Sequence, residues 1–511
     1  MNMWLAALLS ILSGTLLTLG FPGLNVSLLA WFALVPLFVA VQGRSTRQTL
    51  VLGFICGLVH YLTALYWIRY VVHYYGGLPL LLAVLVLLLL CCYLAVYPAL
   101  FALAAHRLEH RPWLWILGLP AVWVTLEWIR AHLLTGFPWA NLGYTQTAFP
   151  RLIQIADVTG VYGISWLVVL GNTAMVAFVR RRSRIGLGIF GICLVVTVLY
   201  GSWRLGAVED LQRHVAPWTV AVAQGNIDQA HKWDPLYQQE TLSRYRQLSL
   251  DAVRHNPSPD LIVWPETAVP FFYGREPRLT GQLHEIIAEL GVPVLFGSPS
   301  AKVIDGEPRL LNSAYLVDPA GRVRADYAKQ HLVPFGEYVP YQRVLFFVHK
   351  LVEAAGNFAA GTDRSPMKID DHEIGMLICY EAIFPYLARR AVDEGATCLV
   401  NITNDAWFGQ SSAPHQHKDM ASWRAIEFRV PLIRCANTGI SAIFDATGKP
   451  LGTIPLGERG YLVASVHPLK VETFYRRWGD LFAWLCVLTA LCVLCAAPVG
   501  RTRIRHGAAK G

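Results

Sequence analysis

Residues 374–385, IGMLICYEAIFP, form the stretch that decides the fold of the second half of the chain. Their apolar start is typical of a buried strand, and a helical pattern follows the turn at Cys379. At a strand-to-helix corner, backbone N–H groups and the positive end of a helix favour a thiolate and can bind an oxyanion. A cysteine among apolar residues is also an ordinary core residue, so this stretch alone leaves both roles open.

Two other stretches carry charged residues next to strand-like runs. LIVWPE at residues 261–266 ends in Glu266, and YAKQHLVPFGEYVP at residues 327–340 carries Lys329 and Glu337. In the order Glu266, Lys329, Cys379 these residues resemble the Glu-Lys-Cys triad of the nitrilase (carbon-nitrogen hydrolase) superfamily. LVNITNDAWFG and the run 415–448 also resemble that family, and the resemblance covers about half of the chain. It implies a four-layer α-β-β-α sandwich.

Composition places the remainder of the chain in a membrane. Of the 511 residues, 54% are hydrophobic and only 15% are charged, whereas an ordinary soluble protein has nearer a quarter charged. The formal charge of +9 raises the question of nucleic acid. Many of the basic residues lie in short loops between apolar segments, so they report membrane topology, and we expect no nucleic-acid partner.

Eight apolar segments are predicted to be transmembrane helices, since most reach the length that a bilayer crossing needs. The first lacks the basic start and small-residue cleavage site of a signal peptide. The second is short and contains Pro36. The segments are residues 4–20, 26–41, 50–72, 80–103, 113–133, 153–179, 185–203 and 481–497.

Arginine follows every even-numbered segment, and the alternate loops carry almost no Lys or Arg. The residues concerned are Arg44, Arg47, Arg107, Arg111, Arg180, Arg181, Arg182, Arg184, Arg501, Arg503, Arg505 and Lys510. The positive-inside rule then predicts cytoplasmic termini and a long extracytoplasmic segment, which suits a bacterial inner membrane with a periplasmic domain. We expect seven transmembrane helices in 1–204, a catalytic domain in 205–477, and the eighth helix with a basic cytoplasmic tail in 478–511.

The segment 205–477 has an α/β pattern. DPAG at 318–321 and DATGK at 445–449 are turn sequences that each divide a hairpin. The predicted strands are 219–223, 261–264, 294–297, 314–317, 373–378, 398–402, 432–435 and 442–444, and the predicted helices are 236–254, 279–290 and 415–428.

Cysteine and histidine placement bears on disulfides and metals. Seven of the 10 cysteines fall in predicted membrane helices, so Cys379, Cys398 and Cys435 remain, and an odd number leaves at least one thiol free. Cys398 and Cys435 lie in strand-like runs and are expected in the core. His415 and His417 form an H-x-H pair without a further zinc motif, so a solvated or substrate-loop role is favoured over a metal. No nucleotide-binding fingerprint occurs, and we predict no cofactor.

The charged residues and the thiol together suit acyl transfer. A desolvated Glu266 would serve as a general base that takes the Cys379 proton and later that of an incoming nucleophile. Lys329 would hold the thiolate and the developing oxyanion, helped by the Tyr380 N–H. Glu337 is a second carboxylate that could position Lys329 or the incoming amine. The alternative for each charged residue is a surface ion pair.

A nitrilase-like domain joined to eight apolar segments resembles the apolipoprotein N-acyltransferase family over essentially the full chain. The resemblance implies a phospholipid acyl donor, most often phosphatidylethanolamine at sn-1, a Cys thioester, and a diacylated apolipoprotein acceptor. By motif it implies Glu266, Lys329 and Cys379 as triad, with Glu337, Tyr380, Glu381 and Trp233 nearby. A membrane-tethered amidase is the alternative enzyme, and a transporter with a sensing domain is the alternative outside enzymes.

Two further patterns leave their roles open. RVLFFVHKL at 343–351, followed by VEAAG, suits either a mobile interfacial lid, since apolar and basic residues occur together, or a core helix. Polar residues within or beside the apolar segments are costly in a membrane and can mark function, although those near segment ends can reach the interface. These residues are His60, Arg69, Glu127, Arg130 and Asp157.

Overall fold

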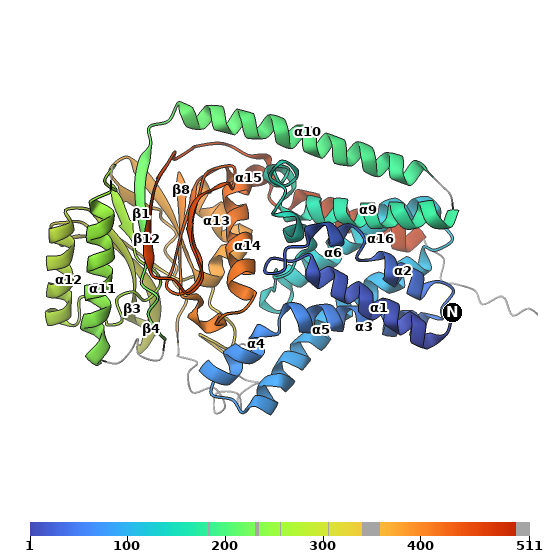
Figure 1. Ribbon diagram of the computed structural model, residues 1–511, viewed down its shortest axis with the longest axis horizontal. Helices are drawn as coiled ribbons and strands as arrows, with labels where there is room; N and C mark the ends of the chain where they lie inside the picture. Colours follow the sequence, from blue (N-terminus) through green and yellow to red (C-terminus); the bar gives the residue numbers. More distant parts are fainter. Residues whose placement is uncertain (182–183, 230–234, 256, 305, 340–357, 497–511) are drawn as a thin grey trace, which may run out of the picture.

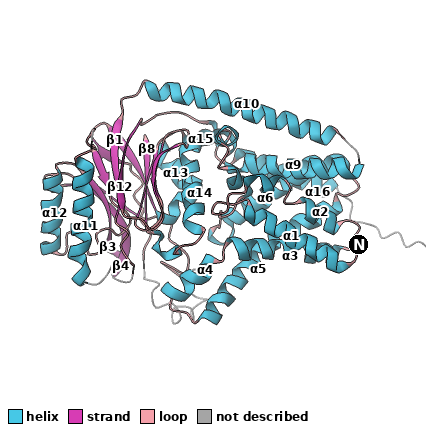
Figure 2. Cartoon of the chain, in the orientation of Figure 1, coloured by secondary structure: helices cyan, strands magenta, loops and turns pink. Residues whose placement is uncertain are grey.

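The computed structural model describes residues 1–181, 184–229, 235–255, 257–304, 306–339 and 358–496. A helical bundle formed by the first two hundred residues and the last helix lies beside an α/β domain (Figures 1 and 2). The chain leaves the bundle through the long helix α10 (Ile185–Arg213), builds the α/β domain, and returns through α15 (Phe474–Trp478) into α16 (Leu481–Ala496).

The α/β domain contains two six-stranded sheets, in the orders β12-β1-β2-β3-β4-β5 and β11-β10-β9-β8-β7-β6. The centre of each sheet is parallel, β1-β2-β3 in one and β7-β8-β9 in the other, and the outer pairs are antiparallel. The strands of the first sheet are β1 (Trp218–Gln224), β2 (Leu261–Val263), β3 (Val294–Ile304), β4 (Glu307–Val317), β5 (Val323–Ala328) and β12 (Gly460–Val466). Those of the second are β6 (Met367–Ile369), β7 (His372–Ile378), β8 (Cys398–Thr403), β9 (Leu432–Ala436), β10 (Ser441–Phe444) and β11 (Pro450–Ile454).

The two sheets face each other across an apolar core that includes Val220, Val263, Ile378 and Val400. Helices α11 (Pro235–Val253) and α12 (Pro277–Leu290) cover the first sheet, and α13 (Pro385–Asp393) and α14 (Ala413–Phe428) cover the second. The central strands are buried on both faces, which explains why they are continuous apolar runs in the sequence rather than alternating ones. The expected four-layer α-β-β-α sandwich is confirmed.

Both predicted turns connect hairpins. Asp318 caps the first turn, because its carboxylate accepts the backbone N–H groups of Ala320 and Arg322 between β4 and β5. Asp445 does the same for Thr447 and Lys449 between β10 and β11. Asp at the first position of such turns satisfies backbone donors that have no ladder partner.

Within the described residues, four helices are long and apolar enough to cross a membrane: α5 (Leu80–Arg107), the helix over Leu114–Thr135, α9 (Val161–Arg181) and α10. A fifth candidate is the pair Thr46–Ala64 and Trp67–Tyr75, bent by 54°. Shorter apolar helices occupy Met3–Leu19, Ser27–Val41 and Leu481–Ala496, so each of the eight predicted segments coincides with apolar helix. Spanning by all eight remains a prediction.

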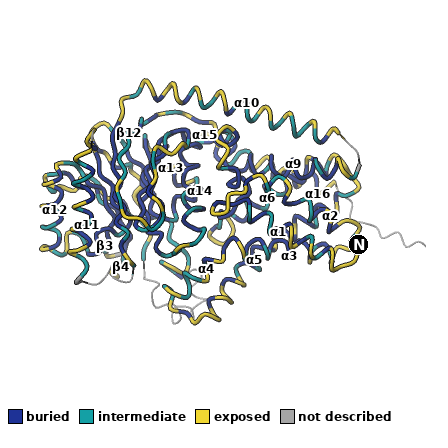
Figure 3. The backbone as a smooth tube through the Cα atoms, in the orientation of Figure 1, coloured by how far each residue is buried: buried dark blue, intermediate teal, exposed yellow. Residues whose placement is uncertain are grey.

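Exposed apolar residues mark the outside of the bundle. Helix α10 is exposed along most of its length (Figure 3), although its outward residues include Ile192, Val195 and Leu199. Leu81 and Leu89 of α5 and Leu488 of α16 are exposed in the same way. Contiguous apolar surface of this extent is characteristic of contact with lipid.

The predicted segment 153–179 is wrong as one continuous helix. Helices α7 (Pro150–Ile153) and α8 (Ala156–Thr159) precede α9, and the chain turns at Gly160, whose φ is +60°. The Tyr475 ring packs there, and a Cβ on Gly160 would lie 2.7 Å from it. The break therefore makes room for the α15 turn, a contact between distant segments that hydropathy cannot detect.

The polar residues of the bundle have structural partners. Glu127 accepts the Leu142 backbone N–H at 2.6 Å, and Arg130 donates to Asn141 Oδ1 at 2.6 Å, so both hold the loop that follows α6 (Leu119–His132). Asp157 accepts from Arg204 at 2.6 Å and from Arg429 of the α/β domain at 2.9 Å. The bundle and the α/β domain are thus joined by buried ionic contacts.

Apolar packing continues across the same junction. One cluster of buried residues contains Val168 of α9, Leu387 of α13 and Ile426 of α14. Indole N–H groups add hydrogen bonds: Trp139 donates to Gln416 at 2.7 Å, and Trp423 donates to Thr147 at 2.9 Å. The helical layer formed by α13 and α14 therefore lies between the second sheet and the bundle.

Candidate active site

Cys379 lies at the carboxyl end of β7, where the chain enters the short helix Cys379–Ile383. Its φ is +54°, an unusual conformation for a residue other than glycine, and strain of this kind is concentrated at functional sites. The side chain is 8% exposed. The strand-to-helix corner predicted from the sequence is confirmed.

Glu266 follows β2 on the opposite sheet and is 6% exposed. One carboxylate oxygen accepts the Asn312 amide at 2.7 Å, and the other accepts the Asn404 backbone N–H at 2.7 Å. Gly297 of β3 allows this backbone to pass closely, since a Cβ there would lie 2.8 Å from the Glu266 Cα. The Glu266 carboxylate is therefore held from two sides and by both sheets.

Lys329 comes directly after β5 and is 1% exposed. Its ammonium donates to Glu337 Oε1 at 2.8 Å. Burial alone would lower the pKa of Lys329, but the neighbouring carboxylates of Glu337 and Glu266 outweigh burial, and the pKa is raised. Lys329 is therefore a fixed positive charge, positioned by Glu337 as predicted and facing both Cys379 and Glu266.

The Cys379 thiol is protonated at rest. Burial and then the charge of Glu266 raise its pKa well above the ordinary value, and the Lys329 charge opposes this only in part. Desolvation therefore works against the thiolate that the strand-to-helix corner was expected to favour, and the Lys329 charge and a hydrogen bond with Thr403 act in its favour. Proton removal by a neighbouring base is therefore part of the chemistry.

Glu381 lies beside the active site and connects its two loops. It is fully buried and accepts the backbone N–H groups of Ile378 at 2.7 Å, Gln330 at 2.7 Å and His331 at 3.0 Å. Burial raises its pKa to about 7, although these N–H donors oppose the rise. Because Ile378 precedes Cys379 and Gln330 follows Lys329, Glu381 fixes the nucleophile relative to the cation.

Of the residues implied by the family resemblance, Tyr380 is described by the structure and Trp233 is not. The Tyr380 ring packs edge-on against Phe384 with centroids 5.0 Å apart, next to the nucleophile. Trp233 lies outside the described residues, and so does the segment 343–356 considered as a lid.

The sequence pattern did not predict a buried network of hydrogen bonds and an ion pair beside the Cys379 backbone. Asp405 accepts from Arg434 at 2.6 Å and faces His417 Nδ1 at 3.1 Å, while His417 Nε2 lies 3.1 Å from the Cys379 carbonyl oxygen. Asp405 and His417 lie in the stretches that carried the family resemblance, but their burial depends on pairing of β8 with β9. Charged residues of this kind are typical of the surface, so composition gave no signal.

His417 is 1% exposed, which makes the solvated role expected for the H-x-H pair wrong for this residue. Its burial and the charge of Arg434 lower its pKa. A neutral imidazole has one N–H, so a ring that donates through Nε2 to the Cys379 carbonyl oxygen accepts at Nδ1 from Arg434, 3.2 Å away. No group of three His, Cys, Asp or Glu side chains that could hold a metal ion occurs in the described part of the chain. Cys398 and Cys435 are fully buried in the inter-sheet core, as expected.

Replacing Asp405 by Asn should lower the free energy of unfolding by about 3 kcal/mol, because the buried Arg434 loses its charged partner. Partner charges and hydrogen bonds lower the pKa of Asp405 to about 2 despite burial, which alone would raise it. Because the pKa of Asp405 is lower in the folded state than its unfolded value of about 4, ionised Asp405 stabilises the fold above about pH 4. This contribution to the free energy of unfolding is lost as the pH falls toward about 2. The difference in thermal midpoint between wild type and variant should therefore narrow below about pH 4.

The midpoint is read from tryptophan fluorescence in detergent, and Asp251→Asn, a change at a partly exposed position of α11, is the control. An Asp405→Asn midpoint equal to that of the control would contradict the role assigned to the network.

Comparison with known proteins divides the chain at the same boundary as the structure. Residues 13–174 match the family model described as apolipoprotein N-acyltransferase N-terminal domain, and residues 219–476 match carbon-nitrogen hydrolase. An amidase from Nesterenkonia sp. AN1 is similar in structure, with 20% identity and a TM-score of 0.40 over 53% of this chain and 97% of that one.

Relatives match along the whole length. An apolipoprotein N-acyltransferase from Geobacter metallireducens is 45% identical over 98% of this chain and 96% of its own. One from Methylococcus capsulatus is 34% identical over 97% and 95%, respectively. With both family domains in order and full-length identity at this level, the chain belongs to the apolipoprotein N-acyltransferase family.

Proposed function

We propose that the protein transfers a fatty acyl chain from a phospholipid to the α-amino group of the S-diacylglyceryl cysteine that begins an apolipoprotein, the last step of bacterial lipoprotein maturation. The observation that carries the proposal is the convergence of Glu266, Lys329 and Cys379, from both sheets, in a site whose outer helical layer packs against an apolar bundle. An enzyme for soluble amides needs only an anchor, whereas a lipid donor and a lipid-anchored acceptor both require access from a bilayer.

The first half-reaction begins with transfer of the Cys379 proton to Glu266. The sulfur attacks the ester carbonyl carbon of the donor, and Lys329 with the Tyr380 N–H stabilises the oxyanion. Collapse breaks the bond to the glycerol oxygen, which takes the proton from Glu266 and leaves as a lysophospholipid. The donor is phosphatidylethanolamine cleaved at sn-1, and the product on the enzyme is a Cys379 thioester.

The second half-reaction uses the same base. The α-amine of the diacylated acceptor gives a proton to Glu266 and attacks the thioester carbon, so that a C–N bond forms and the C–S bond breaks. The proton returns to the Cys379 sulfur. Because the acceptor's diacylglyceryl anchor confines its amine to the leaflet that holds the donor, its effective concentration at the site is high. No cofactor is required.

The test is to incubate purified protein with phospholipid labelled in the acyl chain and to follow label on Cys379. Label should persist without acceptor, because a site closed against bulk water protects a thioester. A diacylated lipopeptide with a free N-terminus should discharge it rapidly, and the N-acetylated lipopeptide should not. Free fatty acid released at equal rates with and without lipopeptide would instead identify a hydrolase.

Topology follows from the arginine pattern, with both termini cytoplasmic and the catalytic domain periplasmic. An impermeant thiol reagent applied to intact spheroplasts should label an Ala320→Cys variant at the β4–β5 turn more strongly than the parent protein. An Arg47→Cys variant at an exposed position in the first turn of α3 (Thr46–Ala64) should gain label only after the membrane is broken. The reverse pattern would contradict the orientation and with it the lipoprotein role.

A further inference from the structure

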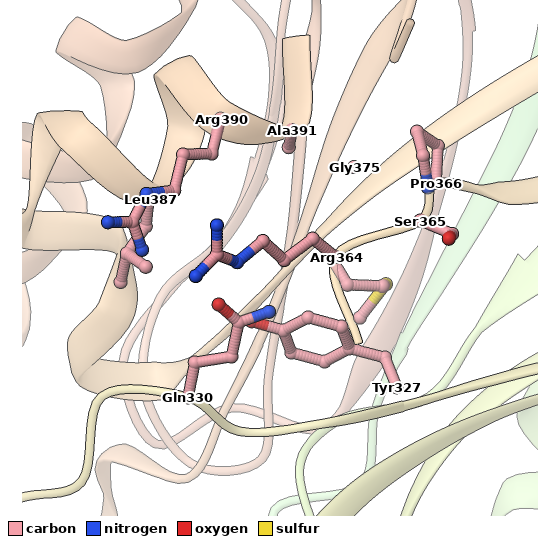
Figure 4. A pocket seen from close by; sticks show the side chains of 10 residues that line it. Tyr327, Gln330, Arg364, Ser365, Pro366, Gly375, Leu387, Arg390 and Ala391 are labelled. Carbon is pink, nitrogen blue, oxygen red and sulfur yellow. The ribbon is translucent and has the colours of Figure 1, made fainter. Parts of the chain in front are cut away.

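A pocket outside the candidate active site opens on the α/β domain between the end of β5, strand β7 and helix α13 (Figure 4). It is a hollow open to solvent, in which a water-sized sphere has about 20 Å³ of free volume, and none of Glu266, Lys329 and Cys379 lines it. Its walls come from the end of β5, the segment before β6, strand β7 and helix α13. The lining residues are Tyr327, Gln330, Arg364, Ser365, Pro366, Gly375, Met376, Leu387, Arg390 and Ala391.

Two arginines with exposed side chains give this pocket its positive charge, and the Asp363 carboxylate lies next to it on Ser365. Arg364 and Arg390 both line it, and no acidic side chain does. Neither arginine forms an ion pair with any described residue. The Arg390 guanidinium lies 5.0 Å from the centre of the Tyr386 ring, a contact through its face that leaves its N–H edges available. Figure 4 shows the Arg364 guanidinium directed between Gln330 and Leu387, on the side of the pocket where Arg390 also lies.

We propose that this pocket binds a phosphate group. Two guanidinium groups that share one hollow repel each other unless an anion lies between them, and guanidinium geometry matches phosphate oxygens through paired N–H donors. The Gln330 amide provides a further donor at the rim, whereas the Ser365 hydroxyl is already hydrogen-bonded to the Asp363 carboxylate. Gln330 Nε2 already donates to the Asp363 carbonyl oxygen at 2.6 Å, which fixes the amide and leaves its second N–H available.

The position of the pocket favours a phospholipid headgroup as the source of that phosphate. Arg389, on the helix that supplies Arg390, donates to the backbone carbonyl oxygens of Arg476 at 2.6 Å and Arg477 at 2.9 Å. These belong to α15, which exposes Phe474 and Trp478 and leads directly into the apolar helix α16. Exposed aromatic residues at the start of such a helix mark the membrane interface. This choice of source rests on the proposed function, whereas the anion site itself does not.

A phosphate bound in this pocket would also affect the position of the active-site loops. Tyr327 and Gln330 form one wall of the pocket and both donate to Glu381, through the phenol at 3.1 Å and the backbone N–H at 2.7 Å. Glu381 holds the Ile378 N–H immediately before Cys379. A phosphate held by Arg364 and Arg390 therefore fastens the loop that carries Lys329 and the turn that carries Cys379 to the same membrane surface.

The probe is a short-chain phosphatidylglycerol with a photoreactive diazirine in its headgroup, applied to the full-length Cys379→Ser protein in neutral detergent. Peptides are mapped by mass spectrometry, so that attachment near α13 is counted separately from attachment at the active site. Arg364→Gln/Arg390→Gln should reduce attachment to residues 385–393 at least tenfold. Arg254→Gln/Arg278→Gln, an equal loss of charge at two exposed positions of the domain, should not change it.

Competition between the probe and inorganic phosphate distinguishes a site for free phosphate from a site for a phospholipid headgroup. Competition at millimolar phosphate would support an anion site filled by free phosphate, and competition by unlabelled phosphatidylglycerol alone would support a headgroup site. Undiminished attachment in the double variant, with a thermal midpoint like that of the parent, would overturn the proposal. If the double variant is unstable, each single variant is measured instead, and attachment unchanged in both overturns the proposal equally. Acylation of Cys379 in the wild type is scored independently, so a failure of the proposed function is recognised separately.

Discussion

Cys379→Ser should fold normally, form no acyl-enzyme, and lose essentially all acyl transfer, a reduction of at least about 10³-fold. The serine hydroxyl fits the same turn, but an alcohol is far less acidic than a thiol, and Glu266 would have to ionise it in a site that already disfavours a charged nucleophile. The measurement combines label from phospholipid on the protein with lipopeptide acylation.

The matched controls are Cys398→Ser and Cys435→Ser, which change the same atom in the inter-sheet core. Each buries a hydroxyl in place of a thiol and should lower thermal stability at most, with transfer retained in the folded fraction. Wild-type transfer by Cys379→Ser, or loss of transfer in all three variants alike, would be incompatible with a Cys379 thioester.

Glu266→Gln is expected to have the second-largest effect, a loss of about 10²- to 10⁴-fold in acyl-enzyme formation. The amide oxygen can still accept from the Asn404 N–H, so the fold should survive, but an amide cannot take the thiol proton. Both half-reactions use this base, and the loss should therefore appear in thioester formation and in discharge.

Discharge can be isolated by starting from acyl-protein made with a thioester exchange reagent. Glu240→Gln on α11, at an exposed position, serves as the control for an equal change of charge. If Glu266→Gln acylates at the wild-type rate, the base lies elsewhere and the assignment of Glu266 is wrong.

The parts that sequence predicted are those specified by neighbouring residues. The run 373–378 is apolar because both of its faces are buried, and the turn at Cys379 follows from the change of pattern after it. DPAG and DATGK form hairpin turns because an aspartate caps each of them. Glu266, Lys329 and Cys379 were chosen by resemblance to the nitrilase superfamily, and the structure places each of them shortly after a strand or at its end; their catalytic roles stay a prediction.

The parts that sequence could not predict depend on contacts between distant segments. Asp405, His417 and Arg434 meet only because β8 pairs with β9 in a fixed register. The break at Gly160 depends on the ring of Tyr475, more than three hundred residues away. The protonation state of Cys379 depends on how deeply it is buried, which local pattern does not report.

The continuous packing of α13 and α14 against the bundle has a consequence for biosynthesis. On the proposed topology, ribosomes finish the catalytic domain before α16 exists, while α16 must later settle beside α6, where Val493 lies 2.9 Å from the position a Cβ would take on Gly118. The exported domain therefore folds while it is in contact with a bundle that still lacks α16. Helix α16 therefore completes the bundle. Chains interrupted before residue 481 would present quality-control proteases with a complete α/β domain attached to an incomplete helical bundle.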